Sequence, residues 1–128
     1  MKFWIFEKKN KYKYTLTEDV TVFSEDYTNI HIIKYSNKKE MLLVICDGLI
    51  TVKKGYAWNG CTGVTDGKND ECKLASCLHD VLYQFKVGKR KDADILFRQL
   101  LHLAKWKYTK LYYLGVRLFG LPYWIIKN

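Results

Sequence analysis

Five residues in the second half of the chain have the types and spacing of a hydrolytic site: His79, Asp80, Tyr83, Arg90 and Asp94. A carboxylate that hydrogen-bonds one imidazole nitrogen fixes the tautomer of the ring. The other nitrogen is then free to take a proton from water or from another nucleophile. We therefore expect His79 to be the base and Asp94 its orienting partner. Tyr83 follows His79 by four residues and lies on the same face of the same predicted helix.

Asp80 and Arg90 would complete such a site. Asp80 follows His79 on a different face of the helix, where its carboxylate can bind a hard cation together with carbonyl oxygens from a glycine-rich loop. Arg90 can hold an anionic group of a substrate, or pair with Asp94 one helical turn away. The alternative is a structural role, because a histidine and an aspartate on packed helices often form a satisfied hydrogen bond.

Two predicted helices position this cluster. Apolar residues recur at helical spacing over about Glu71–Phe85 and again over Ala93–Ala104. The short break at Val87-Gly88-Lys89 makes the two helices antiparallel. His79 then lies about eight residues before the bend and Asp94 about six after it, which at a rise of about 1.5 Å per residue leaves a mismatch of about 3 Å. The two side chains can therefore meet.

The remaining pattern predicts an α+β fold. The first half has β-rich runs separated by turn residues, typical of an antiparallel meander: Tyr12–Leu16, Val20–Ser24, Ile30–Tyr35, Met41–Cys46 and Leu49–Val52. Asp47-Gly48 favours a two-residue hairpin turn. A third helix is expected at about Thr109–Phe119. At 128 residues we expect one domain, with a β-rich part (1–54), a glycine-rich loop (55–68) and a helical part (69–128).

The net charge of +9 indicates an anionic partner. An anionic surface or substrate, such as lipid, and an acidic protein both fit. Nucleic acid is less favoured because no nucleic-acid-binding motif accompanies the lysines. The most apolar stretch, Leu111–Ile126, contains Arg117 and Pro122 and is shorter than the roughly 20 residues of a transmembrane helix, so we expect none.

The cysteines and the N-terminal sequence indicate the compartment. The four cysteines form no CxxC pair, which is typical of reduced thiols in a cytosol-like compartment. Cys72 and Cys77 are five residues apart in a predicted helix, so they point in different directions and make a poor zinc ligand pair. Charge returns early after Met1, before the apolar core of a signal peptide is complete, so we do not expect secretion by that route.

Two motifs in the second half resemble known families. His79-Asp80-x-Leu82-Tyr83-Gln84, followed by Arg90-x-x-Ala93-Asp94-x-x-Phe97, resembles the phage and prophage domain-of-unknown-function family numbered 1353. The resemblance covers about Gly55–Gly120. The helix pair alone is similar to the core of the phospholipase A2 superfamily. In that superfamily the histidine activates water, the next aspartate holds calcium with loop carbonyls, and the distant aspartate and a tyrosine orient the histidine.

The resemblance implies a role for each matching residue. The catalytic group is His79, Asp94 and Tyr83. Calcium would be held by Asp80 and by the loop residues, which we take to be Asn59, Gly60 and Gly63. Arg90 and Trp58 are the candidates for substrate binding. Asn59 stands where the phage family has aspartate, and the disulfides of secreted phospholipases are missing from this sequence.

We therefore expect a small phage-encoded hydrolase with a His/Asp dyad, assisted by a metal, that cleaves an ester or similar bond in a lipid or other anionic substrate. The alternative is a non-enzymatic phage virion or tail protein, or a binder of host factors, in which the same cluster is structural. Other virion proteins would then be its partners. The expected location is the cytoplasm of the infected host cell or the phage virion.

Overall fold

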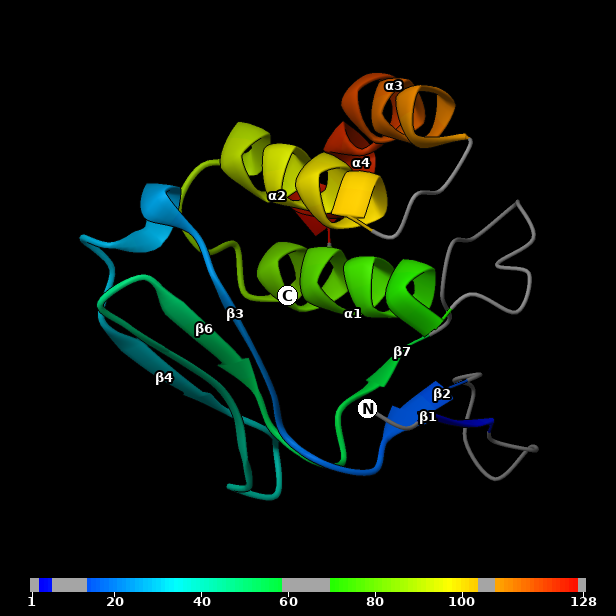
Figure 1. Ribbon diagram of the computed structural model, residues 1–128. Helices are drawn as coiled ribbons and strands as arrows, with labels where there is room; N and C mark the ends of the chain where they lie inside the picture. Colours follow the sequence, from blue (N-terminus) through cyan, green and yellow to red (C-terminus); the bar gives the residue numbers. More distant parts are fainter. Residues whose placement is uncertain (1–2, 6–13, 59–69, 104–107, 127–128) are drawn as a thin grey trace. The chain divides into compact units, whose positions relative to one another are not determined.

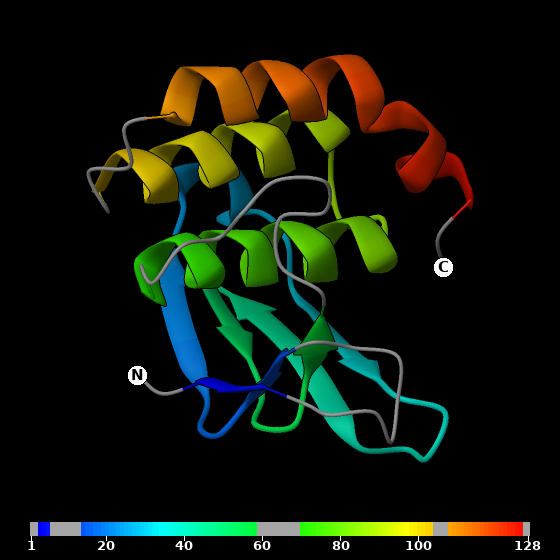
Figure 2. The same ribbon diagram turned by 90° about the vertical axis from the view of Figure 1, so that its right-hand side faces the viewer.

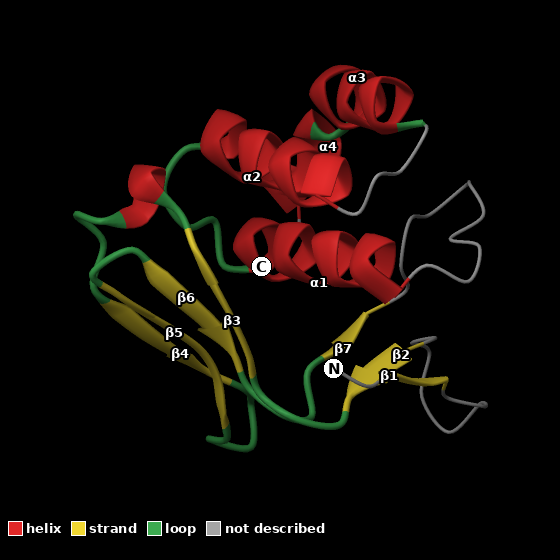
Figure 3. Cartoon of the chain, in the orientation of Figure 1, coloured by secondary structure: helices red, strands yellow, loops and turns green. Residues whose placement is uncertain are grey.

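The computed structural model describes residues 3–5, 14–58, 70–103 and 108–126. The chain divides into two compact units, Met1–Gly60 and Cys61–Asn128, and each is described by itself. The predicted single domain, with part boundaries near residues 54 and 68, stays a prediction. The α+β class is confirmed, because the described strands belong to the first unit and the long helices to the second (Figure 3).

The described residues of the first unit form two antiparallel sheets. The smaller has the order β1-β2-β7, with β1 at Phe3–Ile5, β2 at Tyr14–Leu16 and β7 at Ala57–Trp58. The larger has the order β3-β6-β5-β4 (Figure 1). Its strands are β3 at Val20–Phe23, β4 at Ile32–Tyr35, β5 at Met41–Cys46 and β6 at Leu49–Val52. A short 3-10 helix, η1, at Glu25–Tyr27 connects β3 to β4.

The strand order differs from a continuous meander. Strands β4, β5 and β6 follow one another in space as in sequence, but β3 pairs with β6, starting from Val20 opposite Val52. Strand β2 pairs in the other sheet, with Tyr14 opposite Trp58 of β7. Alternation of apolar and polar residues identifies a strand without identifying its partner, because pairing depends on contacts that are distant in sequence.

The turn between β5 and β6 is the predicted Asp-Gly hairpin. Asp47 and Gly48 both have positive φ, 52° and 81°, as a type I′ turn requires. A β-carbon at Gly48 would also lie 2.6 Å from a ring carbon of Phe23, so that exposed ring would have to shift. The prediction of this turn is confirmed.

The second unit contains four described helices. They are α1 at Asp70–Gln84, α2 at Arg90–Leu103, α3 at Thr109–Phe119 and α4 at Leu121–Ile126. Helix α2 lies between α1 and α3 (Figures 1 and 2). The first three agree closely with the predicted helices. Helix α4 was not predicted, and Pro122 is compatible with it because proline fits the first turn of a helix.

The connection between α1 and α2 determines how the site is assembled. Lys86 takes a left-handed conformation, with φ of 50°, and Gly88 follows with φ of 64°. The Lys86 and Val87 amides donate to the carbonyls of Tyr83 and Leu82, at 3.2 and 3.0 Å, which is the bonding of a Schellman helix end. This compact end reverses the chain, so that α2 runs back along α1.

The core of the helical unit lies between its helices. Ala75 of α1, Phe97 and Leu101 of α2 and Tyr112 of α3 form one buried cluster. Among the described helices, none combines the length and the apolar composition that crossing a membrane requires.

Candidate functional site

The predicted contact between His79 and Asp94 is present. The Nε2 atom of His79 on α1 lies 2.7 Å from Oδ1 of Asp94 on α2. An ionised carboxylate only accepts, so Nε2 donates, and in a neutral ring Nδ1 then carries the lone pair. No described residue hydrogen-bonds Nδ1, and the His79 side chain is 14% exposed. Asp94 therefore holds one ring nitrogen, and no residue of the described ranges binds the other.

Aromatic neighbours restrict the orientation of the His79 ring. The Tyr83 ring centroid lies 4.1 Å from that of His79, and the Phe97 centroid lies 4.8 Å away. Trp124 of α4 packs edge-on against Tyr83, at 5.2 Å. These contacts, together with the bond to Asp94, hold the imidazole in one position, as a general base requires.

Asp94 is the centre of the hydrogen-bond network. Its side chain is completely buried. Besides His79, Oδ1 accepts from the Tyr83 hydroxyl at 2.6 Å, and Oδ2 accepts from Nη1 of Arg117 at 2.7 Å. Burial by itself raises the pKa of Asp94, but the hydrogen bonds from His79, Tyr83 and Arg117 outweigh it and lower the pKa below its usual value. Asp94 is therefore an anion at neutral pH.

Tyr83 remains a hydrogen-bond donor over the physiological pH range. Burial, and the bond that its hydroxyl donates to the Asp94 carboxylate, raise the pKa of Tyr83 well above its usual value. Its hydroxyl also accepts from Nη1 of Arg90 at 3.3 Å. Tyr83 thus orients Asp94, and Asp94 in turn orients His79.

Arg117 is a member of the site that the sequence analysis did not include among the candidates. It comes from α3 and forms an ion pair with Asp94 at 2.7 Å. It is the only charged residue between Leu111 and Ile126. A single charge in a long apolar segment is a signal for a buried ion-pair partner, and this signal was available in the sequence.

Arg90 makes several contacts within the protein. Its Nη1 lies 3.6 Å from Oδ2 of Asp94, so the predicted pairing one helical turn away is present. It also donates to the carbonyls of Val116 and Arg117 at the end of α3, at 3.1 and 3.3 Å. The Val116 carbonyl also accepts from the Gly120 amide, at 2.9 Å, so Arg90 adds a second donor there and attaches the start of α2 to the end of α3. The predicted binding of a substrate anion by Arg90 stays a prediction.

The predicted calcium ligands are only partly described. Asp80 is half-buried on α1, whereas Asn59, Gly60 and Gly63 lie outside the described residues. Within the described ranges, no group of three candidate ligand side chains includes Asp80. The structure therefore describes one of the four predicted calcium ligands, and calcium binding stays a prediction.

Trp58, the second candidate for substrate binding, belongs to the first unit and has no exposed surface. Its ring packs with Tyr14 and Tyr56, at centroid distances of 5.5 and 6.3 Å. This is the environment of a core residue. Its predicted role in binding a substrate stays a prediction.

The fold and site define an α+β protein with a histidine–carboxylate pair held among three helices. Comparison of the chain with protein family models, with curated proteins and with solved structures gave no match. The resemblances to the phage family and to the phospholipase A2 superfamily therefore stay predictions that rest on sequence motifs.

Proposed function

We propose that this protein is a hydrolase in which His79 and Asp94 activate water against an ester or similar bond. The observation that carries the proposal is that buried Asp94 holds one nitrogen of His79 at 2.7 Å, while the other has no partner among the described residues. In the proposed reaction, water attacks the carbonyl carbon and gives its proton to Nδ1. The imidazolium then donates that proton to the leaving oxygen as the ester bond breaks.

Asp94 would stabilise the imidazolium that forms in this step, because its negative charge lies next to the ring. Arg117 and Arg90 work in the opposite direction, since both guanidinium groups lie within 4 Å of the same carboxylate and partly neutralise it. Tyr83 is a positioning residue, because its hydroxyl acts on His79 through Asp94 and its ring packs directly against the imidazole.

Exposed apolar side chains support a lipid substrate. On α3 and α4, five large apolar side chains are between 48% and 62% exposed: Leu111, Leu114, Leu118, Leu121 and Ile125. Residues 95–128 contain six lysines and arginines and no acidic residue. An apolar helix face with only basic charge is suited to an anionic lipid surface. We refer to these five residues as the α3–α4 apolar face.

Calcium is part of the proposal through the resemblance to the phospholipase A2 superfamily. When bound, it would stabilise the negative charge that develops on the carbonyl oxygen. Asp80 is the described candidate ligand. In the proposal His79 transfers the proton, and Asp94 and Tyr83 position His79. None of these roles requires the metal, so substitutions of the three residues can be tested separately from calcium binding.

The test is His79→Gln, with His102→Gln as the matched control. A glutamine amide keeps a donor for Asp94 but has no basic nitrogen that could take a proton in place of Nδ1. His102 is an exposed histidine on α2. We measure fatty-acid release from phosphatidylglycerol vesicles and hydrolysis of a soluble short-chain ester, with calcium and with a chelator. We expect His79→Gln to lose activity by at least about a hundredfold and the control to keep it. Full activity of His79→Gln would overturn the proposal.

A non-enzymatic role is the second candidate, because one observation favours it. Asp94 of α2 is bound by His79 and Tyr83 of α1 and by Arg117 of α3, so the cluster connects three helices. On this hypothesis, substitutions in the cluster change stability, and the wild-type chain hydrolyses none of the esters. Stoichiometric copies of the chain in purified phage particles would support a virion or tail role.

A further inference from the structure

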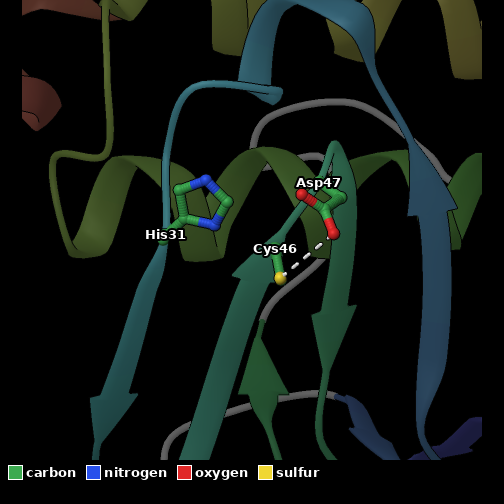
Figure 4. Close-up of side chains that lie close together, drawn as sticks. All are labelled: His31, Cys46 and Asp47. Atoms are coloured by element: carbon green, nitrogen blue, oxygen red, sulfur yellow. Dashed lines mark hydrogen bonds between the residues drawn. The ribbon is translucent and has the colours of Figure 1, made fainter.

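A second cluster of chemically competent side chains lies in the first unit, at the end of the β5–β6 hairpin. His31, Cys46 and Asp47 each have a ligand atom within 4.8 Å of the other two, and all three residues are exposed. The Sγ atom of Cys46 lies 3.6 Å from Oδ2 of Asp47. Figure 4 shows the imidazole, the thiol and the carboxylate gathered in one place. Among the described residues this is the one such group of three.

Secondary structure accounts for the convergence of these side chains. The β4–β5 ladder pairs Ile32 with Ile45, so His31 and Cys46 are at the next position along the two antiparallel strands. Side chains at such opposed positions are close, with β-carbons about 5 Å apart. Asp47 follows Cys46 directly, in the left-handed conformation of the hairpin turn.

The backbone around the cluster is well fixed. The amide of Ser24 donates to the carbonyl of Gly48 at 2.9 Å, which attaches the turn to the end of β3. The amide of Ile30 donates to the carbonyl of Tyr27 at 3.2 Å and shapes the segment that leads to His31. A ligand set on a fixed hairpin loses little conformational entropy when it binds a metal.

We propose that His31, Cys46 and Asp47 form a binding site for a zinc-class divalent cation, with a fourth coordination position open to solvent. Imidazole nitrogen, thiolate sulfur and carboxylate oxygen are the three ligand types that zinc takes from proteins. A single carboxylate with a thiolate does not suit calcium or magnesium, which prefer several oxygen ligands. On binding, Cys46 releases its thiol proton to solvent and the thiolate coordinates the metal.

The distances fit this assignment. Metal–ligand bonds of about 2.0 to 2.3 Å in a tetrahedron place neighbouring ligand atoms about 3.5 Å apart. The Cys46 sulfur and the Asp47 oxygen are already at 3.6 Å, and the remaining pairs lie within 4.8 Å. Rotation of exposed side chains is sufficient to close the difference. The site belongs to the first unit, so it is independent of the hydrolase proposal for His79.

The test is titration of the reduced, metal-free full chain with cobalt(II), followed by zinc. We expect one cobalt per chain and a thiolate-to-cobalt charge-transfer band in the near ultraviolet, which zinc then removes. Cys46→Ser should abolish the band. His31→Gln and Asp47→Asn should each weaken binding by at least about tenfold. Asn tolerates the left-handed conformation, so Asp47→Asn keeps the hairpin turn.

The control is His102→Gln, which removes an exposed histidine from the second unit and should leave the affinity unchanged. Melting temperatures without metal show whether each variant is folded. A band that persists in Cys46→Ser would place the metal on another cysteine and overturn the assignment. The absence of any thiolate band in the wild-type chain, or unchanged affinity in both His31→Gln and Asp47→Asn, would overturn it as well.

Discussion

Asp94 has no exposed surface, and a charge in that position is tolerated only because donors surround both of its oxygens. Removing water from a carboxylate costs several kcal/mol, which hydrogen bonds and nearby positive charges must offset. Hydrogen bonds from His79, the Tyr83 hydroxyl and the Arg117 guanidinium offset this cost, and Arg117 adds a positive charge. The same arrangement holds the imidazole, so the stability of the helical unit and the orientation of its candidate base depend on one residue.

We expect Asp94→Asn to lower the free energy of unfolding by roughly 3 kcal/mol, because it leaves Arg117 and Arg90 without their anion. The value is at the low end for a broken buried pair, since Arg117 is 30% exposed. Urea denaturation measures it. Asp92→Asn removes a charge from the same helix without breaking this network and should cost less than about 1 kcal/mol. Equal losses in the two variants would contradict the central place given to Asp94.

The pKa shift of Asp94 predicts a loss of stability in acid. Its folded-state pKa lies below the ordinary value of 3.8, so the folded state binds this proton less tightly than the unfolded state. The contribution is therefore complete above pH 3.8 and is lost as the pH falls through the folded-state pKa. Urea unfolding midpoints of the wild type should fall in this range more steeply than those of Asp94→Asn. Parallel pH profiles would disagree with this account.

The pKa shift of Tyr83 predicts a loss of stability in alkali. Its folded-state pKa lies above the ordinary value of 10.0, so the folded state holds the phenol proton more tightly. The contribution is present below pH 10.0 and is lost as the pH rises above it. Tyr83→Phe should remove this alkaline loss, and unfolding midpoints of the two proteins would show it. Tyr113→Phe, a tyrosine on α3, is the control and should leave the loss in place.

At the scale of elements, the close approach of α1, α2 and the end of α3 requires a glycine. A β-carbon at Gly120 would overlap the carbonyl oxygen of Val116 and would lie 2.6 Å from the Tyr83 hydroxyl and 3.0 Å from Nη1 of Arg90. Gly115, in the middle of α3, has no atom within 4 Å of the same position. An added β-carbon is therefore sterically excluded at Gly120 and accommodated at Gly115, so alanine substitutions at the two positions should have different effects on stability.

We expect Gly120→Ala to lower the free energy of unfolding by about 1 to 3 kcal/mol, because the Val116 carbonyl, Tyr83 and Arg90 must all move to make room. Gly115→Ala should instead raise it by about 0.5 to 1 kcal/mol, since alanine loses less entropy in a helix. Urea denaturation of both variants tests the pair. A stabilising Gly120→Ala would show that the described packing around Tyr83 is wrong.

At the scale of the whole molecule, the proposed function combines the charge of the chain with its exposed apolar surface. The chain carries a net charge of +9, and the α3–α4 apolar face lies in a segment that has basic but no acidic residues. Large exposed apolar patches on proteins are often sites of interaction with another protein or with a membrane. In the proposed function, this face would bring the chain to an anionic lipid surface.

We expect the chain to bind phosphatidylglycerol vesicles more tightly than phosphatidylcholine vesicles, and added salt to weaken the difference. Leu118→Gln should reduce binding by about fivefold, which corresponds to losing about 1 kcal/mol of apolar burial. Ile33→Gln, which changes an exposed apolar residue of β4, is the control and should have no effect. Vesicle co-sedimentation measures all three proteins. Equal binding of Leu118→Gln and the wild type would exclude this face as the contact.

The sequence by itself determined the features that depend on neighbours along the chain. Helical periodicity and a short break predicted α1, α2 and their antiparallel packing, and so the contact between His79 and Asp94, 15 residues apart. The Asp47-Gly48 pair predicted its turn because few residues accept positive φ. Only the tertiary structure placed Arg117 against Asp94, 23 residues away, and β3 beside β6. It also brought His31 to Cys46 and Asp47. Periodicity reports which face of an element is buried, whereas the choice of partner depends on long-range packing.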